Sequence, residues 1–242
     1  MDTIFLIVAL STLSPILGSF IGVIKRPSEG FMYMMLSFAA GVMLAISFLE
    51  LIPESIELSS ELICIAGLIV GSAGMHMIDR LIPHVHPDLC DDINGANLKR
   101  TSIYLIVGIF MHNFPEGMAL ALGTVTDTKV SIVIAVAIAI HNIPEGICTA
   151  APYYHCTRDR MRAFLLSSST AIPILLGFLS AYYLFRSITF EVLGFLVAVT
   201  AGLMIFICAD ELIPSSSRKI TNRSTVFPLF AGIIFVILLQ SY

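Results

Sequence analysis

Eight apolar runs, each close to 20 residues long, constrain the fold of this chain more than any other feature. A helix of about 20 apolar residues crosses the roughly 30 Å of hydrocarbon in a bilayer, and a helix satisfies its own backbone hydrogen bonds there. The sequence therefore predicts an all-α membrane protein, a bundle of eight transmembrane helices. In chain order, the predicted spans 1 to 8 cover residues 4–24, 31–53, 62–82, 101–123, 130–151, 163–185, 190–213 and 225–241.

Composition supports a chain that lies almost entirely in the membrane. Apolar residues make up 57% of it and charged residues 12%, whereas ordinary soluble domains carry about 25% charged residues. The joints between the spans are short, so we expect a single integral membrane domain over residues 1–242, surrounded by the lipid bilayer and without nucleic-acid partners. The N-terminus lacks the basic start of a cleaved signal peptide, and span 1 is therefore expected to stay in the membrane.

Basic residues predict how the spans are oriented. Of the 13 Lys and Arg residues, all but Lys129 and Arg186 lie in the joints after spans 1, 3, 5 and 7 or near the end of span 3. Cytoplasmic loops carry the excess of Lys and Arg in membrane proteins. We therefore expect those joints in the cytoplasm and both termini outside. A short chain without a targeting segment suits a bacterial inner (plasma) membrane.

One hexapeptide occurs twice inside the apolar runs. His-Asn-x-Pro-Glu-Gly occupies residues 112–117 in span 4 and returns 29 residues later at 141–146 in span 5. On a helix, a spacing of four stacks the His and Glu of each copy on one face. Each Pro removes a backbone N–H and should kink its helix, which frees the carbonyls of Met111 and Ile140. Ionisable groups inside a span are costly and usually functional.

These side chains predict a site for a divalent cation, provided that spans 4 and 5 pack face to face. Imidazole nitrogen and carboxylate oxygen together suit zinc and iron. Two ionised Glu side chains in one bundle would repel each other, and one dication would neutralise both. Metal binding would then release protons. The alternative is a polar plug in which His and Glu are hydrogen-bonded to one another. The predicted ligands are His112, Glu116, His141 and Glu145, with the amides of Asn113 and Asn142 beside them.

A second pair of sequences repeats around the first. Ala-Gly-x-Met at 40–43 precedes Glu-Leu-Ile-Pro at 50–53 in span 2, and the same two tetrapeptides occur at 201–204 and 211–214 in span 7 with the same spacing. Spans 2 and 7 run in opposite directions, as do spans 4 and 5. This placement predicts an inverted internal repeat, with the site near the midplane. The alternative is that Glu-Leu-Ile-Pro merely ends each helix in interfacial water.

With these motifs the chain resembles the ZIP (Zrt/Irt-like) family of divalent metal-ion transporters, and within it the bacterial ZupT-like branch. The resemblance implies import of Zn²⁺ and other divalent metals into the cytoplasm without ATP hydrolysis. It also implies a transport site that is formed by spans 4 and 5 and often holds two metals. The likeness covers nearly the whole chain and is carried by residues 46–53, 79–87, 112–117, 141–146 and 210–214.

The same resemblance implies a ligand set for each metal. One metal would bind His112, Glu116, His141 and Glu145, and its neighbour would bind both Glu and both Asn side chains. Relatives in this branch usually carry a Glu in span 6 that completes the second position, where this chain has Ile174 and no acid in the span. With two carboxylates instead of three, a second dication would be poorly neutralised. We therefore predict one tight site, with the second weak or absent.

Other side chains are candidates for the metal path. His84 and His86 lie in the predicted cytoplasmic joint after span 3, where the family has a His-bearing loop thought to receive or sense metal. Two His residues in a short polar loop are also often simply solvated. In spans 2 and 7, the candidates for pathway or supporting groups are Met43, Ser47, Glu50, Asp210 and Glu211.

Three functions are compatible with these sequence features. The leading one is a secondary transporter without a catalytic cofactor, most selective for Zn²⁺ but also accepting Fe²⁺, Mn²⁺ and Co²⁺. A membrane-embedded metalloenzyme would need a base and an open coordination position for water, yet Asn113 and Asn142 stand where an HExxH motif has its Glu. A non-transporting sensor would need a soluble output domain, and no segment of this sequence resembles one. The Gly-rich spans would also allow a homodimer.

Overall fold

The computed structural model describes residues 2–25, 28–81, 106–114, 116–118, 120–121, 128–184, 189–217 and 226–240. Every regular element within these ranges is helical, and residues 106–114, 116–118 and 120–121 are helical as well. The elements are α1 (Asp2–Ile24), α2 (Glu29–Ile46), η1 (Ser47–Leu51), α3 (Ile52–Leu58), α4 (Glu61–Leu81), α6 (Thr128–Thr157), α7 (Arg160–Ser168), α8 (Ala171–Leu179), η2 (Ser180–Leu184), α9 (Phe190–Ile207), η3 (Cys208–Leu212), α10 (Ile213–Ser217) and α11 (Val226–Gln240).

Five helical stretches among the described residues are long and apolar enough to cross a membrane, and they match the predicted spans 1, 2, 3, 6 and 7. A shorter apolar helix, Val226–Leu238, falls in span 8. The 30-residue helix α6 contains span 5, and the helical residues between 106 and 121 lie in span 4. The prediction of an all-α membrane protein is confirmed, while the count of eight spans stays a prediction. The five stretches are Leu6–Ile24, Tyr33–Leu58, Glu61–Ile78, Arg160–Tyr183 and Phe190–Ser217.

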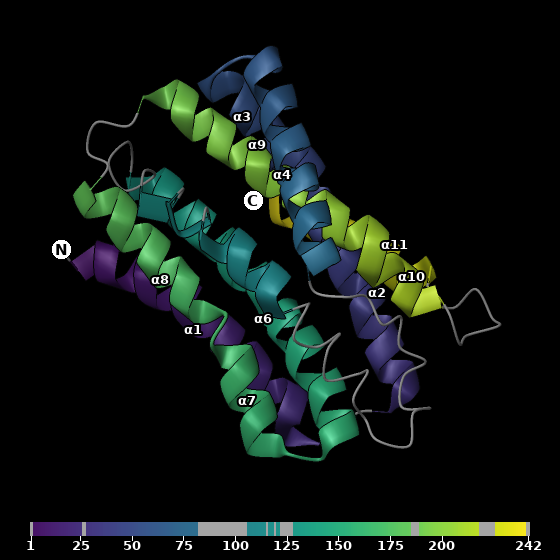
Figure 1. Cartoon of the computed structure of the whole chain (residues 1–242). Helices are drawn as coiled ribbons and strands as arrows, with labels where there is room; N and C mark the ends of the chain where they lie inside the picture. The colour runs from purple at the N-terminus through teal and green to yellow at the C-terminus, as the bar shows by residue number, and fades with distance from the viewer. Residues whose placement is uncertain are drawn as a thin grey trace.

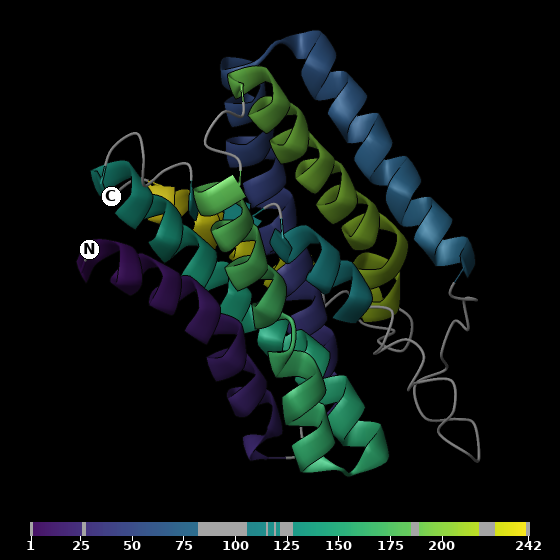
Figure 2. The ribbon, with the colours of Figure 1, turned by 60° about the vertical axis from the view of Figure 1, so that its left-hand side comes forward.

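The helices form two packed groups (Figure 1). In the first, α1 packs against α6, α7 and α8. In the second, α4 packs along α9, α11 packs along α2, and α3 also lies on α9. Helix α2 contacts α6 and so connects the two groups, which Figure 2 shows from a second side. The two copies of the hexapeptide belong to the first group, because Phe114, Gly117 and Met118 lie against α8, and α6 contacts α1.

Glycine allows close backbone contact between paired helices. A Cβ placed on Gly177 would clash with the backbone carbonyl of Phe114, and one on Gly117 would clash with that of Ile174. Small residues at such crossings let helices in a membrane approach closely. Span 4 and α8 are therefore held together at the glycine that ends the first hexapeptide. The same reciprocal contact joins Gly18 with Gly146, Gly41 with Gly232, and Gly71 with Gly202.

Helices α2 and α9 have matching local structure as well as matching sequence. Each is 18 residues long and begins after a hydroxyl N-cap, Ser28 or Thr189, that accepts a backbone N–H three residues on. Each continues into a five-residue π-helix, η1 or η3, and a Pro follows as the second residue of the next helix. Since Pro cannot donate to the preceding turn, the widened turn is where the ladder of hydrogen bonds is interrupted. Such π-turns often occur at functional sites.

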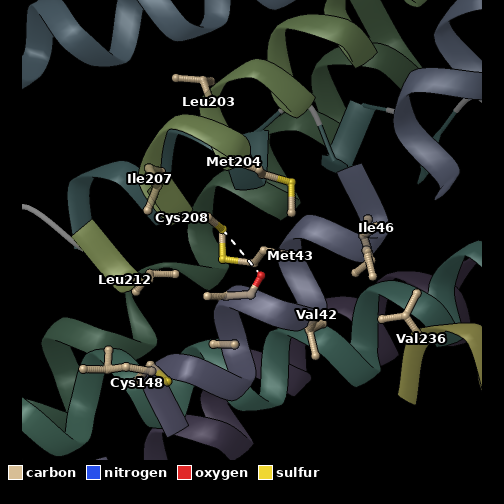
Figure 3. Packing of buried hydrophobic residues seen from close by; sticks show 14 of the residues in the cluster. Val42, Met43, Ile46, Cys148, Leu203, Met204, Ile207, Cys208, Leu212 and Val236 are labelled. Carbon is tan, nitrogen blue, oxygen red and sulfur yellow. Dashed lines mark hydrogen bonds between the residues drawn. The ribbon is translucent and has the colours of Figure 1, made fainter. Parts of the chain in front are cut away.

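The largest apolar core lies where α2, α9 and η3 meet α6 and α11. Met43 and Met204, which are equivalent positions of the repeated tetrapeptides, are both buried there (Figure 3). The Cys208 thiol donates a hydrogen bond to the carbonyl of Ala40 at 3.8 Å, across the α2–η3 contact. Cysteine and methionine here act as polarisable packing groups. This core keeps α2 and α9 in fixed register beside the helix that carries the second hexapeptide.

Candidate metal site

The first hexapeptide lies in a buried helical segment. His112 and Asn113 are fully buried, and Glu116 is 5% exposed. The backbone is helical up to residue 114 and again over 116–118, while Pro115 lies outside the described residues. A spacing of four on this helix directs the imidazole and the carboxylate to one face. The chain therefore places an ionisable pair inside the protein rather than toward lipid.

The second hexapeptide lies in the middle of α6, which continues through Pro144. Asn142 is fully buried and Glu145 is 2% exposed. The backbone of His141 belongs to α6, but its side chain lies outside the described residues. The fourth predicted ligand therefore has a known place on the helix and no described side-chain contact.

A buried contact between a His and a Glu connects the two hexapeptides. His112 Nε2 lies 3.3 Å from Glu145 Oε1, and both side chains are buried. The pair requires span 4 and α6 to face each other at the level of the predicted ligands, which is the arrangement that the sequence predicted. A buried charge is tolerated only when it is paired or when it coordinates a metal. The structure thus brings together one nitrogen and one oxygen of the predicted ligands, from different spans.

Several polar atoms around this pair have no hydrogen-bond partner within the described part of the chain. Both amide atoms of Asn142, Asn113 Oδ1 and Glu145 Oε2 are buried in this state. Buried polar groups are nearly always satisfied, so atoms like these indicate unused capacity to bind a further group. Nitrogen and oxygen donors of these kinds suit a divalent cation such as zinc or iron.

The described side chains do not by themselves complete a metal site. Among them, no group of three or more His, Cys, Asp or Glu is close enough to hold an ion. Glu116 belongs to the same hexapeptide as His112, and His112 contacts Glu145 of the other copy. The grouping of all four predicted ligands therefore stays a prediction, and it depends on the side chain of His141.

Span 6 borders the site with a hydroxyl-lined junction between α7 and α8. Asn113 Nδ2 donates a hydrogen bond to the carbonyl of Thr170 at 2.7 Å. Ser167, in the last turn of α7, contacts the hydroxyls of Ser19 and Thr149. Sequence reasoning missed these residues, because Ser and Thr in an apolar helix usually bond to their own backbone. Their spacing in the sequence does not distinguish the Ser and Thr residues that bridge helices from those that bond to their own helix.

Ile174 occupies the position where the family resemblance implies a carboxylate. It lies in α8, it is fully buried, and its carbonyl lies against Gly117. Aliphatic packing therefore fills this part of span 6. A cation next to Asn113 would find no charged side chain contributed from here.

Four of the candidates in spans 2 and 7 lie within the π-helices, Ser47 and Glu50 in η1 and Asp210 and Glu211 in η3. Ser47 is buried and donates to the carbonyl of Met43 at 2.8 Å. Glu211 is buried, and the Ser215 hydroxyl donates to its Oε1 at 3.4 Å. Glu50 and Asp210 are partly buried in η1 and η3. The predicted loop residues His84 and His86 lie outside the described residues.

Comparison with known proteins gives a consistent match along the chain. The family model described as ZIP zinc transporter matches residues 83–240. A protein named zinc transporter ZupT from Shigella flexneri is 32% identical to this chain, with 96% of this chain and 93% of that protein covered. Proteins of the same name from Salmonella paratyphi A and Salmonella newport have the same identity and coverage.

Proposed function

The chain belongs to the ZIP zinc transporter family, and we propose that it is a secondary transporter that imports divalent cations into the cytoplasm without ATP hydrolysis. Zn²⁺ is the main substrate in this proposal, and Fe²⁺, Mn²⁺ and Co²⁺ are also accepted. The protein is an integral membrane protein and a transporter, not an enzyme. The matched relatives are named zinc transporters, which favours a transporter over the metalloenzyme or sensor considered above.

The contact between His112 and Glu145 carries this proposal. It joins the two copies of the hexapeptide at 3.3 Å in a buried place. A polar plug would account for one such contact, but it gives no role to the buried amide of Asn142, which has no hydrogen-bond partner among the described residues. We assign the ligands of the tight site as His112, Glu116, His141 and Glu145, with Asn113 and Asn142 next to them. The imidazole would exchange its contact with the carboxylate for the metal.

Electrostatics explains why a dication fits this place. Two carboxylates, Glu116 and Glu145, are buried, and no Lys or Arg is buried among the described residues. Ionised groups in a membrane interior are expensive. One divalent cation supplies two positive charges and neutralises both. The imidazole of His112 adds a neutral nitrogen ligand that zinc and iron prefer to magnesium or calcium. The substrate is therefore expected to be a transition-metal dication.

We further propose that the transporter is a single domain built as an inverted repeat, with the site near the midplane. The matching lengths, N-caps and π-helices of α2 and α9 support this. So does the pairing of glycines, because Gly117 and Gly146 are equivalent motif positions and each packs against a different helix. The proposed orientation has both termini outside, in a bacterial inner membrane, and a homodimer is compatible with it.

Uptake by the purified protein tests the proposal. Liposomes that contain the protein and enclose a zinc-responsive dye are expected to brighten after Zn²⁺ is added outside, in the absence of ATP. Added Mg²⁺ should neither enter nor compete. Liposomes without protein supply the background rate. A protein that binds Zn²⁺ in solution but leaves the liposome signal at background would instead favour a sensor.

We predict one tight Zn²⁺ per chain, because Ile174 supplies no third carboxylate. In the variant Ile174→Glu, the new carboxylate would lie beside span 4 and is expected to raise the number of bound Zn²⁺ from one to two per chain. Ile174→Gln has nearly the same size without the charge and should keep the number at one. Equilibrium dialysis followed by elemental analysis measures this number. Two equally tight ions in the unaltered protein would contradict the prediction.

A further inference from the structure

A buried cluster of hydroxyls lies directly beside the second hexapeptide. Ser19 of α1, Thr149 of α6 and Ser167 of α7 are each 1% exposed or less. The Ser167 hydroxyl lies 2.6 Å from that of Ser19 and contacts that of Thr149. It also donates to the carbonyl of Gly146 at 3.1 Å. Three helices therefore meet at one serine side chain.

The cluster holds the turn of α6 that carries Glu145. Thr149 donates to the carbonyls of Glu145 and Gly146 at 3.0 and 3.1 Å, and Ser167 donates to the second of these. Pro144 cannot donate to the carbonyl of Ile140, so the helix is weakened one turn before this point. The side-chain hydroxyls thus support a turn that its own backbone supports less than usual.

The same junction reaches the first hexapeptide. Thr170 Oγ1 donates to the carbonyl of Ser167 at 2.8 Å, and the carbonyl of Thr170 accepts from Asn113 Nδ2 at 2.7 Å. Hydrogen bonds of Thr170 and Ser167 therefore link Asn113, through the α7–α8 junction, to the carbonyl of Gly146. Because span 6 has no acid, its polar contribution among the described residues is made by hydroxyls and carbonyls.

The number of contacts at Ser167 shows why a hydroxyl is needed there. A serine hydroxyl donates one hydrogen bond and accepts two, and the oxygens of Ser19, Thr149 and Gly146 all lie within hydrogen-bond distance of the Ser167 hydroxyl. Alanine would remove all three interactions and leave two other buried hydroxyls with fewer partners. Groups that do not bind the metal but hold one of its ligands in place typically change metal affinity about 10- to 100-fold when they are removed.

We propose that the hydroxyls of Ser167 and Thr149 position the Glu145 carboxylate for the metal, an inference that rests on the proposed transport site. Both are positioning residues, since neither is placed as a ligand. Their effect is on how well the carboxylate is held when the ion binds. The rate at which the loaded protein moves its ion should depend on them much less.

Isosteric variants separate this role from plain packing. Thr149→Val keeps the shape and removes the hydroxyl, whereas Thr149→Ser keeps the hydroxyl and removes a methyl group. We expect Thr149→Val and Ser167→Ala each to raise the KM for Zn²⁺ uptake and the Kd for Zn²⁺ about tenfold, with the maximal rate changed less than about twofold. Thr149→Ser should recover the affinity of the unaltered protein.

Ser168 provides a matched control. It is the next residue in α7, and its hydroxyl has no hydrogen-bond partner among the residues described, so Ser168→Ala should leave KM and Kd unchanged. Unchanged Kd in both Thr149→Val and Ser167→Ala, or a loss of thermal stability alone, would overturn the inference. The transport proposal would survive that result, because it fails only if the unaltered protein does not move Zn²⁺ into liposomes.

Discussion

Replacing Glu145 with Gln is expected to reduce Zn²⁺ uptake to near the background rate. The carboxylate forms the buried contact with His112 and has a second oxygen, Oε2, without a hydrogen-bond partner in the described structure. Gln has the same shape but supplies no charge to the dication. Losing this charged ligand is expected to raise the Kd for Zn²⁺ at least about 100-fold, which corresponds to about 3 kcal/mol. Zn²⁺ titration of the purified variant and liposome uptake measure the effect.

Glu145→Gln should lower Zn²⁺ affinity without lowering the thermal stability of the metal-free protein. Without the cation, the neutral amide introduced by Glu145→Gln avoids the cost of burying a carboxylate in the membrane interior. The thermal midpoint of this variant in the presence of chelator should therefore equal or exceed that of the unaltered chain. Glu57→Gln, at an exposed acid in α3, is the control and should bind and transport as before. Normal Zn²⁺ affinity in Glu145→Gln would remove Glu145 from the ligand set.

The membrane fold was predictable because it follows from local composition. A run of about 20 apolar residues has few alternatives to a spanning helix, and five described stretches lie where the sequence predicts spans. The contact between His112 and Glu145 was also predictable, because the repeated motif puts costly ionisable groups inside spans and such groups face partners. The repeated hexapeptide therefore indicated, from the sequence alone, that spans 4 and 5 lie close together.

The contacts between helices and the π-turns could not be predicted from local composition. Serine and threonine such as Ser167 and Thr149 look like ordinary polar residues of a span, and their bridging role depends on which helix lies opposite. The partners of Gly117 and Gly18 likewise depend on the packing order of the helices rather than on the local sequence. The π-turns of η1 and η3 were missed as well. Their Pro residues indicate an interrupted hydrogen-bond ladder but leave open how the helix adjusts.

Gly177→Ala is expected to destabilise the protein strongly and to abolish uptake. The added Cβ would clash with the backbone carbonyl of Phe114, the residue after Asn113 in the first hexapeptide. A backbone atom cannot rotate away as a side chain can, so α8 and span 4 would have to separate. Overpacking in a close-packed interior typically costs about 1–3 kcal/mol or more. For a chain of this size we expect the thermal midpoint to fall by about 5 °C or more.

Gly74→Ala is the matched comparison for this variant. Gly74 also lies within a helix, α4, but a Cβ placed there meets nothing within 4 Å. Alanine favours a helix over glycine by about 1 kcal/mol, so this variant should keep or slightly raise the thermal midpoint and transport normally. The two variants add the same methyl group and differ only in the opposing backbone. Equal melting of Gly177→Ala and Gly74→Ala would mean that span 4 and α8 are not in rigid contact, and the position of Asn113 against Thr170 would then need another support.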